Sequence, residues 1–143
     1  MSEVIFRSDE EVWALLRGFE SCELPPAEFD HARHLAVALA LVARLGDERA
    51  AAARVREGLK RYIAAHGVDA RKYHETVTVF WVRRVRAFME RAGAGRTLSH
   101  LANELAAECG DPRLVYDYYS RALIVSEEAR AGRVEPDLKP LDF

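Results

Sequence analysis

The chain has few of the features that mark disulfide-rich, metal-thiolate or membrane proteins. Its 143 residues include only two cysteines, Cys22 and Cys109, which stand far apart. They form neither a disulfide framework nor the paired spacing of zinc and redox sites, and we expect a reduced, cytoplasmic setting. No apolar run reaches the length of a membrane span, and the first residues lack a signal-peptide pattern. We therefore expect no membrane partner.

An excess of charge of one sign is also absent. The chain has 21 Lys and Arg residues against 23 Asp and Glu residues, which gives a formal net charge of −2. A nucleic-acid-binding domain usually carries a basic surplus, so we expect no nucleic-acid partner. Hydrophobic residues make up 50% of the chain and charged residues 31%, as in ordinary globular proteins. The length predicts a single domain over residues 1–143.

Capping residues and glycines divide the chain into helices. Apolar positions recur at spacings of three and four, and almost nothing alternates with the period of a strand. Residues with good N-cap side chains open the segments, namely Ser8, Asp30, Asp47, Asp69, Thr97 and Ser126. Glycines close the longer ones, at Gly46, Gly67, Gly93 and Gly110. We predict an all-α fold: an antiparallel helical bundle of about five to six helices, with residues 132–143 as an extended C-terminal tail.

Histidines continue the apolar stripe of two of these helices. His31 and His34 follow the cap Asp30, and His74 is the fifth residue after the expected cap Asp69. Short connections favour antiparallel neighbours, so the second and fourth helices should begin at the same end of the bundle. A rise of about 1.5 Å per residue then places His34 and His74 at nearly the same depth. His66, at the end of the third helix, would be a fourth member of this buried histidine cluster.

Such a cluster has the chemistry of a metal site. Neutral imidazole is a common ligand of zinc, copper and non-haem iron. Three histidines with an open coordination position would activate water or dioxygen. We therefore predict a metal-dependent enzyme or metal-binding protein acting on a small molecule, with His31, His34 and His74 as metal ligands. Glu75 as general base and Tyr73 as proton donor are the candidate catalytic residues.

Two other interpretations remain open. Helix N-termini carry partial positive charge, which repels a cation and favours a small anion. The same end could thus belong to a non-catalytic module that binds a small anion or a protein partner, or the histidines could be structural only. Glu28 and His31 have the E-x-x-H spacing of di-iron bundles, but no second such motif exists. Glu28 remains a candidate carboxylate beside the cluster.

Several segments resemble an uncharacterised family of small bacterial all-helical proteins. The first two resemble F-x-H-x-x-H-[LV] and K-Y-H-x-T, and the likeness extends from Phe29 toward the C-terminus through Phe29–Leu35, Lys72–Thr76, Tyr118–Ser120 and Glu135–Leu141. His31, His34, Tyr73, His74 and Thr76 match the motif positions, whereas His66 matches none. The resemblance implies a helical fold and supports the three-histidine set, but it implies no particular reaction.

Overall fold

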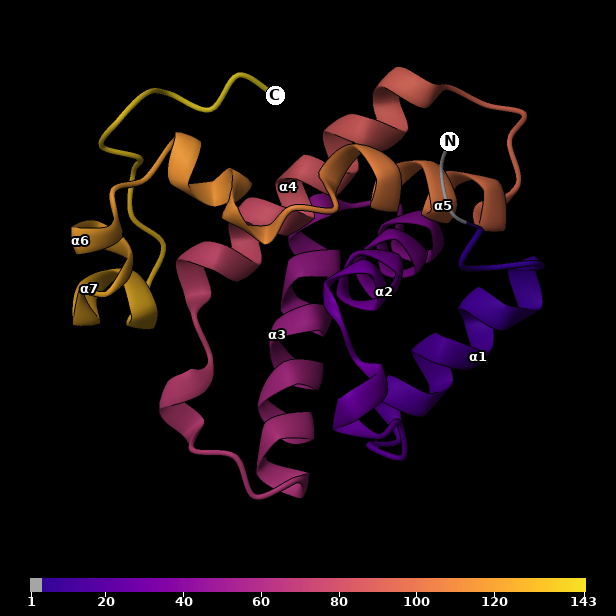
Figure 1. Ribbon diagram of the computed structural model, residues 1–143, viewed down its shortest axis with the longest axis horizontal. Helices are drawn as coiled ribbons and strands as arrows, with labels where there is room; N and C mark the ends of the chain where they lie inside the picture. Colours follow the sequence, from indigo (N-terminus) through magenta and orange to yellow (C-terminus); the bar gives the residue numbers. More distant parts are fainter. Residues whose placement is uncertain (1–3) are drawn as a thin grey trace.

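The computed structural model of the protein describes residues 4–143, and within that range all of its regular secondary structure is helical, with no strand (Figure 1). The prediction of an all-α fold is confirmed. Five longer helices form most of the molecule: α1 (Asp9–Glu20), α2 (His31–Leu45), α3 (Glu48–Ala65), α4 (Glu75–Ala92) and α5 (Leu98–Cys109). Three 3₁₀ turns and two single-turn helices complete the chain: η1 (Pro26–Glu28), η2 (Ala70–Lys72), η3 (Pro112–Asp117), α6 (Arg121–Ile124) and α7 (Glu127–Ala131).

Most helix starts lie where the sequence places them. The side chains of Ser8, Asp30, Asp47 and Thr97 each accept a hydrogen bond from the backbone N–H three residues later. These bonds satisfy amides that have no partner inside the helix. Gly46 ends α2 in the left-handed conformation, with φ of 68°, which glycine adopts without steric cost.

The predicted start of the fourth helix is wrong. Asp69 accepts a hydrogen bond from the backbone N–H of Arg71 and is the N-cap of the short turn η2 only, because its side chain competes locally with helix formation. Tyr73 is then extended, and His74 is the N-cap of α4. His74 therefore precedes the helix and does not lie five residues inside it.

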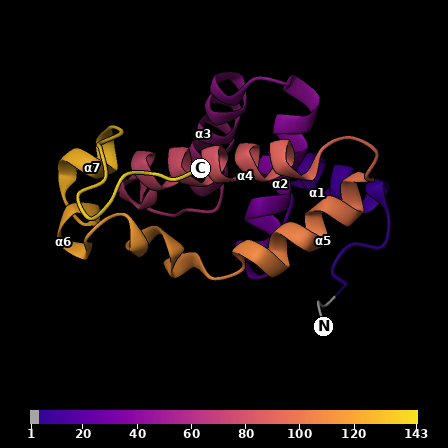
Figure 2. The ribbon, with the colours of Figure 1, turned by 90° about the horizontal axis from the view of Figure 1, so that it is seen from above.

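Helix α2 is the centre of the molecule. It packs against α1, α3, α4 and α5, and Figure 2 shows α3 and α5 on opposite sides of α2 and α4. All side chains from Leu35 to Val42 are buried. The buried surface is thus wider than the single stripe read from the sequence, as expected for a helix surrounded by others. The first turn of α2, which carries the histidines, is partly accessible, as is its last turn from Ala43 to Leu45.

The C-terminal segment forms a second core against α4. Phe80 of α4 contacts the rings of Tyr118, Tyr119 and Phe143. Residues 132–143 contain no helix or strand, and Figure 1 shows this segment with α6 and α7 beside the start of α4. Among residues 4–143, no helix combines the length and apolar character required to span a lipid bilayer.

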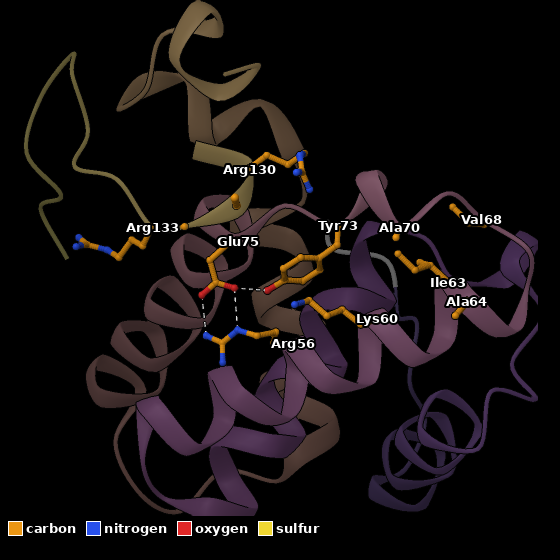
Figure 3. A pocket seen from close by; sticks show the side chains of 12 residues that line it. Arg56, Lys60, Ile63, Ala64, Val68, Ala70, Tyr73, Glu75, Arg130 and Arg133 are labelled. Atoms are coloured by element: carbon orange, nitrogen blue, oxygen red, sulfur yellow. Dashed lines mark hydrogen bonds and ion pairs between the residues drawn. The ribbon is translucent and has the colours of Figure 1, made fainter. Parts of the chain in front are cut away.

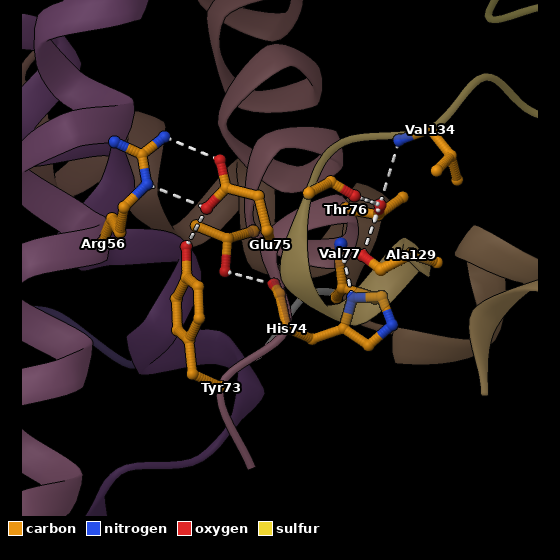
Figure 4. Close-up of polar contacts among 10 residues, drawn as sticks. Arg56, Tyr73, His74, Glu75, Thr76, Val77, Ala129 and Val134 are labelled. Atoms are coloured by element: carbon orange, nitrogen blue, oxygen red, sulfur yellow. Dashed lines mark hydrogen bonds and ion pairs between the residues drawn. The ribbon is translucent and has the colours of Figure 1, made fainter. Parts of the chain in front are cut away.

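The buried hydroxyl of Thr76 ties this segment to α4. Its Oγ1 accepts a hydrogen bond from the backbone N–H of Val134 and lies 2.7 Å from the carbonyl oxygen of Ala129 (Figure 4). Because a buried polar group without a partner costs free energy, these bonds favour one position of the chain after α7. That position places α7 beside the first turn of α4.

Candidate functional site

All three histidines predicted as ligands line one cavity of about 600 Å³. We call it the histidine cavity. Its wall comes from the first turns of α2 and α4, the inner face of α3, and η3; beside the histidines it includes Phe29, Leu35, Val55, Leu59, Ile63, Lys72, Tyr73, Val77, Trp81, Arg113 and Tyr116. The volume is in the range of small-molecule sites.

His34 is the imidazole with free ring nitrogens. Its ring stacks on Phe29 with centroids 3.7 Å apart, and its nitrogens form no hydrogen bond with any residue in 4–143. Burial, followed by the proximity of His31, lowers the pKa of His34. More than a third of its surface is nevertheless accessible, and the residue forms part of the cavity wall. Water at this accessible surface solvates an imidazolium in part.

His31 is held by the end of α5. Its Nε2 lies 3.0 Å from the carbonyl oxygen of Cys109, to which a neutral ring donates when the proton is on Nε2. The ring meets the edge of Trp81 at a centroid distance of 4.8 Å. Burial lowers the pKa of His31, and the bond to Cys109 only partly opposes this effect. His31 is therefore a neutral group near pH 7.

Both ring nitrogens of His74 are used by the fold. Its Nδ1 accepts a hydrogen bond from the backbone N–H of Val77 at 3.2 Å (Figure 4). Its Nε2 lies 2.7 Å from the carbonyl oxygen of Ile124, so the proton is on Nε2. A metal ion would have to break either the helix cap or the bond to α6.

The described residues do not assemble a metal centre. Among residues 4–143, no group of three or more His, Cys, Asp or Glu side chains is arranged to hold a metal ion. His66 does not join the other imidazoles, because its Nε2 lies 3.0 Å from the carbonyl oxygen of Cys22 and its ring packs on Tyr62. Glu28 is exposed at the end of η1 and lies outside the cavity wall.

The charged side chains that line the histidine cavity are of one sign. Within the described part of the chain, no Asp or Glu side chain lines it, whereas Lys72 and Arg113 do. Arg113 pairs with the exposed Asp111 at 3.0 Å, and Lys72 forms no ion pair with residues 4–143. The remainder of the wall is mainly apolar and aromatic. Such a surface suits a ligand with an apolar body and an anionic group.

The two predicted catalytic residues belong to a neighbouring cavity of about 570 Å³ (Figure 3). We call it the arginine cavity, and Tyr73 lines both cavities. The hydroxyl of Tyr73 donates to Oε1 of Glu75 at 2.5 Å. Arg56 of α3 holds the same carboxylate through two N–H groups, at 2.8 and 2.7 Å (Figure 4). This bidentate geometry is the strongest form of an arginine–carboxylate pair.

These contacts move the pKa values of both groups away from neutral pH. The bond from Arg56 lowers the pKa of Glu75, so the carboxylate is ionised and a weak base. Burial, and then the bond to Glu75, raises the pKa of Tyr73 well above its usual range. General acid–base catalysis is most effective with a pKa near the working pH. The geometry therefore favours a binding or wall-forming part for this pair, and the catalytic assignment stays a prediction.

Sequence reasoning missed several wall residues. Arg56 follows the inward-facing Val55 on α3, yet its partner Glu75 is 19 positions away, and nothing local indicates the pair. Trp81, which is half-buried beside His31, was not among the predicted site residues. Lys72 carries no signal beyond its place in the K-Y-H-x-T segment.

No protein-family model, curated protein or solved structure matches this chain. The likeness to a family of small bacterial proteins stays a prediction. Function must therefore be inferred from the two cavities and the side chains that line them.

Proposed function

We propose that the protein binds a small aromatic carboxylate in the histidine cavity. The character of the wall carries this proposal: it is apolar and aromatic, it includes Lys72 and Arg113, and it contains no carboxylate from residues 4–143. An aromatic body buried here gains roughly 25 cal/mol for each Å² of apolar surface removed from water. The ligand carboxylate is favoured by the cations and is not repelled by any acid in the wall.

His34 is the residue through which the bound anion would be sensed. Its ring nitrogens have no protein partner within the described residues, and its N–H can donate to a carboxylate. An anion beside the ring stabilises the imidazolium and raises its pKa. Binding should then take up a proton, so we expect the affinity for a carboxylate to increase as the pH falls from 8 to 6.

Calorimetric titration with benzoate, and with benzamide as its neutral counterpart, tests the proposal. We expect benzoate to bind about tenfold more tightly than benzamide, because a charge-assisted bond contributes more than a neutral one. Lys72→Gln should remove most of that preference. Lys60→Gln is the matched control, because Lys60 lines only the arginine cavity. Equal affinities for the two compounds, or no binding of either, would contradict the proposal.

The helix directions expected from the sequence fit this site. Residues at the beginning of α2 and at the beginning of α4 line the same cavity, as an antiparallel order of α2, α3 and α4 requires. We propose that this order, with residues 132–143 as an extended tail beside α4, is the working architecture.

Metal binding is the second candidate function, and the observation that favours it is the presence of three imidazoles in one cavity wall. It requires His74 to give up its bond to the Ile124 carbonyl or its cap. Metal analysis of untagged protein after exposure to zinc, iron or copper tests it. Retention of one equivalent, lost in both His31→Ala and His34→Ala, would support a metal site over an anion site. Less than a tenth of an equivalent would exclude it.

A further inference from the structure

The arginine cavity has a charged end and an apolar end. Figure 3 shows Arg56, Lys60 and Glu75 close together at one end, with Arg130 on the other side of Tyr73. The other end is formed by small and aliphatic side chains, those of Ile63, Ala64, Val68 and Ala70. A ligand that fills such a cavity needs a polar head and an apolar body in that order.

The charged end has more positive charge than its own carboxylate can balance. Arg56 is neutralised by its bidentate contact with Glu75. Lys60 forms no ion pair with any residue in 4–143, and its Nζ lies 5.1 Å from the ring centre of Tyr73. Arg130 holds Glu127 through two N–H groups, and because Glu127 is two-thirds exposed, water can replace that contact. Lys60 can therefore bind a ligand directly, and Arg130 can do so by exchanging the exposed Glu127 for the ligand.

We propose that the arginine cavity binds a phosphate monoester with an apolar organic group. A phosphate monoester carries a charge of about −2 near pH 7, which Lys60 and Arg130 balance when Arg130 exchanges the exposed Glu127 for the phosphate. The guanidinium of Arg130 suits two phosphate oxygens at once, and the ammonium of Lys60 acts as a point charge. The organic group would rest on Ile63 and Val68. Arg133 is not used, because its guanidinium points away from the other cations (Figure 3).

This site does not depend on the histidine cavity. The two cavities share Tyr73 and Ile63, but the charged residues of each line that cavity alone. Lys60 and Lys72 are both exposed and each lines only one cavity, so each lysine is the control for the other. Substitution of one should leave the ligand of the other cavity unaffected.

Calorimetric titration at low salt tests the proposal with phenyl phosphate, inorganic phosphate and phenol. We expect phenyl phosphate to bind about tenfold more tightly than inorganic phosphate, because only the ester reaches the apolar end, and phenol not to bind. Lys60→Gln and Arg130→Gln should each weaken phenyl phosphate about tenfold, as the loss of one charge-assisted contact does. Lys72→Gln should leave that affinity within about twofold, since it removes no contact of this kind. Circular dichroism confirms that each variant is folded.

Three results would overturn the proposal. The first is no heat from phenyl phosphate at millimolar concentration. The second is equal affinity for inorganic phosphate, which would assign the site to the free anion. The third is phenyl phosphate binding that Lys72→Gln weakens and Lys60→Gln does not, which would move the ligand to the histidine cavity. Benzoate binding that survives in Lys60→Gln separates a failure here from a failure of the carboxylate proposal.

Discussion

The two cavities share the ring of Tyr73, yet the fold holds their polar groups in different ways. In the histidine cavity, His31 and His74 are fixed by backbone carbonyl oxygens of Cys109 and Ile124. In the arginine cavity, Arg56 and Glu75 are fixed by each other. A neutral imidazole can satisfy a carbonyl without any charge, whereas a guanidinium keeps its charge at every accessible pH. The first cavity can thus gain a proton with its ligand, and the second carries permanent charge.

Removal of the carboxylate in the arginine cavity should have the largest effect on stability. Glu75→Leu leaves Arg56 without its anion and Tyr73 without its acceptor. Loss of one partner of a fully buried pair costs about 3–5 kcal/mol. Because the Arg56 side chain is 34% exposed, water replaces part of that contact, and we expect a loss of about 2 kcal/mol in the free energy of unfolding.

Urea denaturation followed by circular dichroism measures this loss. Glu57→Leu is the control, because Glu57 is an exposed residue of α3 next to Arg56. This variant should change the free energy of unfolding by less than about 0.5 kcal/mol. Equal stabilities for the two variants would mean that the Arg56–Glu75 pair does not stabilise the fold.

Loss of the imidazole of His74 should have the next largest effect. His74→Ala removes the N-cap of α4 and the bond to the Ile124 carbonyl, and we expect a cost of about 1–2 kcal/mol. His74→Asn can cap the helix but is too short to keep the bond to α6, so it should recover about half of the loss.

Thermal and urea unfolding of both variants separate the two contributions. His100→Ala is the control, because His100 is exposed and, among residues 4–143, its side chain bonds only to Glu104. If His74→Asn is no more stable than His74→Ala, the cap contributes nothing and the contact with α6 explains the whole effect.

The sequence predicts the first of the two cavities better than the second. Ser8, Asp30, Asp47 and Thr97 act through amides three residues away, so local reading finds these helix starts. The shared face of His31 and His34 on α2 depends on helix periodicity, which is also local. His74 reaches the cavity as the N-cap of α4, which periodicity does not predict. The actual start of α4 was missed, because an Asp side chain such as that of Asp69 can cap a 3₁₀ turn as well as a full helix.

Long-range bonds explain the remainder of what was missed. The partners of His31 and His74 are backbone carbonyls 78 and 50 positions away, and no side-chain pattern marks a carbonyl as an acceptor. The prediction of three free metal-binding imidazoles could not include those bonds. Arg56 and Glu75 likewise meet only after α3 and α4 pack.

A smaller effect is expected at the residue common to both cavities. Tyr73→Phe keeps the ring and removes the hydrogen bond to Glu75, whose carboxylate still has Arg56. We expect a loss of about 1 kcal/mol in the free energy of unfolding. The affinities for benzoate and phenyl phosphate should change by less than about threefold, because the ring remains in both walls. A larger loss for one ligand would identify the hydroxyl as a direct contact in that cavity.

The smallest effect distinguishes the cavities by pH. The folded pKa values of His31 and His34 lie below the unfolded value near 6.5, so the unfolded chain binds protons first as the pH falls. Their contribution is complete above pH 6.5 and is lost between 6.5 and the lower folded values. For Glu75, whose pKa is also lowered, the contribution is complete above about 4.5 and is lost only below it.

The free energy of unfolding, measured between pH 8 and 3.5 for the wild type, His34→Gln and Glu75→Gln, resolves the two windows. Subtracting the free energy of unfolding of each variant from that of the wild type cancels the contributions of the other titrating groups. Since the His34 ring is partly solvated, we expect its difference curve to fall by less than about 1 kcal/mol between pH 7 and 5. The Glu75 curve should be flat there and fall below pH 4.5. A His34 difference curve that is flat from pH 7 to 5 would mean that the imidazole is as well solvated as in the unfolded chain. The folded protein would then not favour the neutral imidazole, and the expected uptake of a proton with a bound carboxylate would lose its basis.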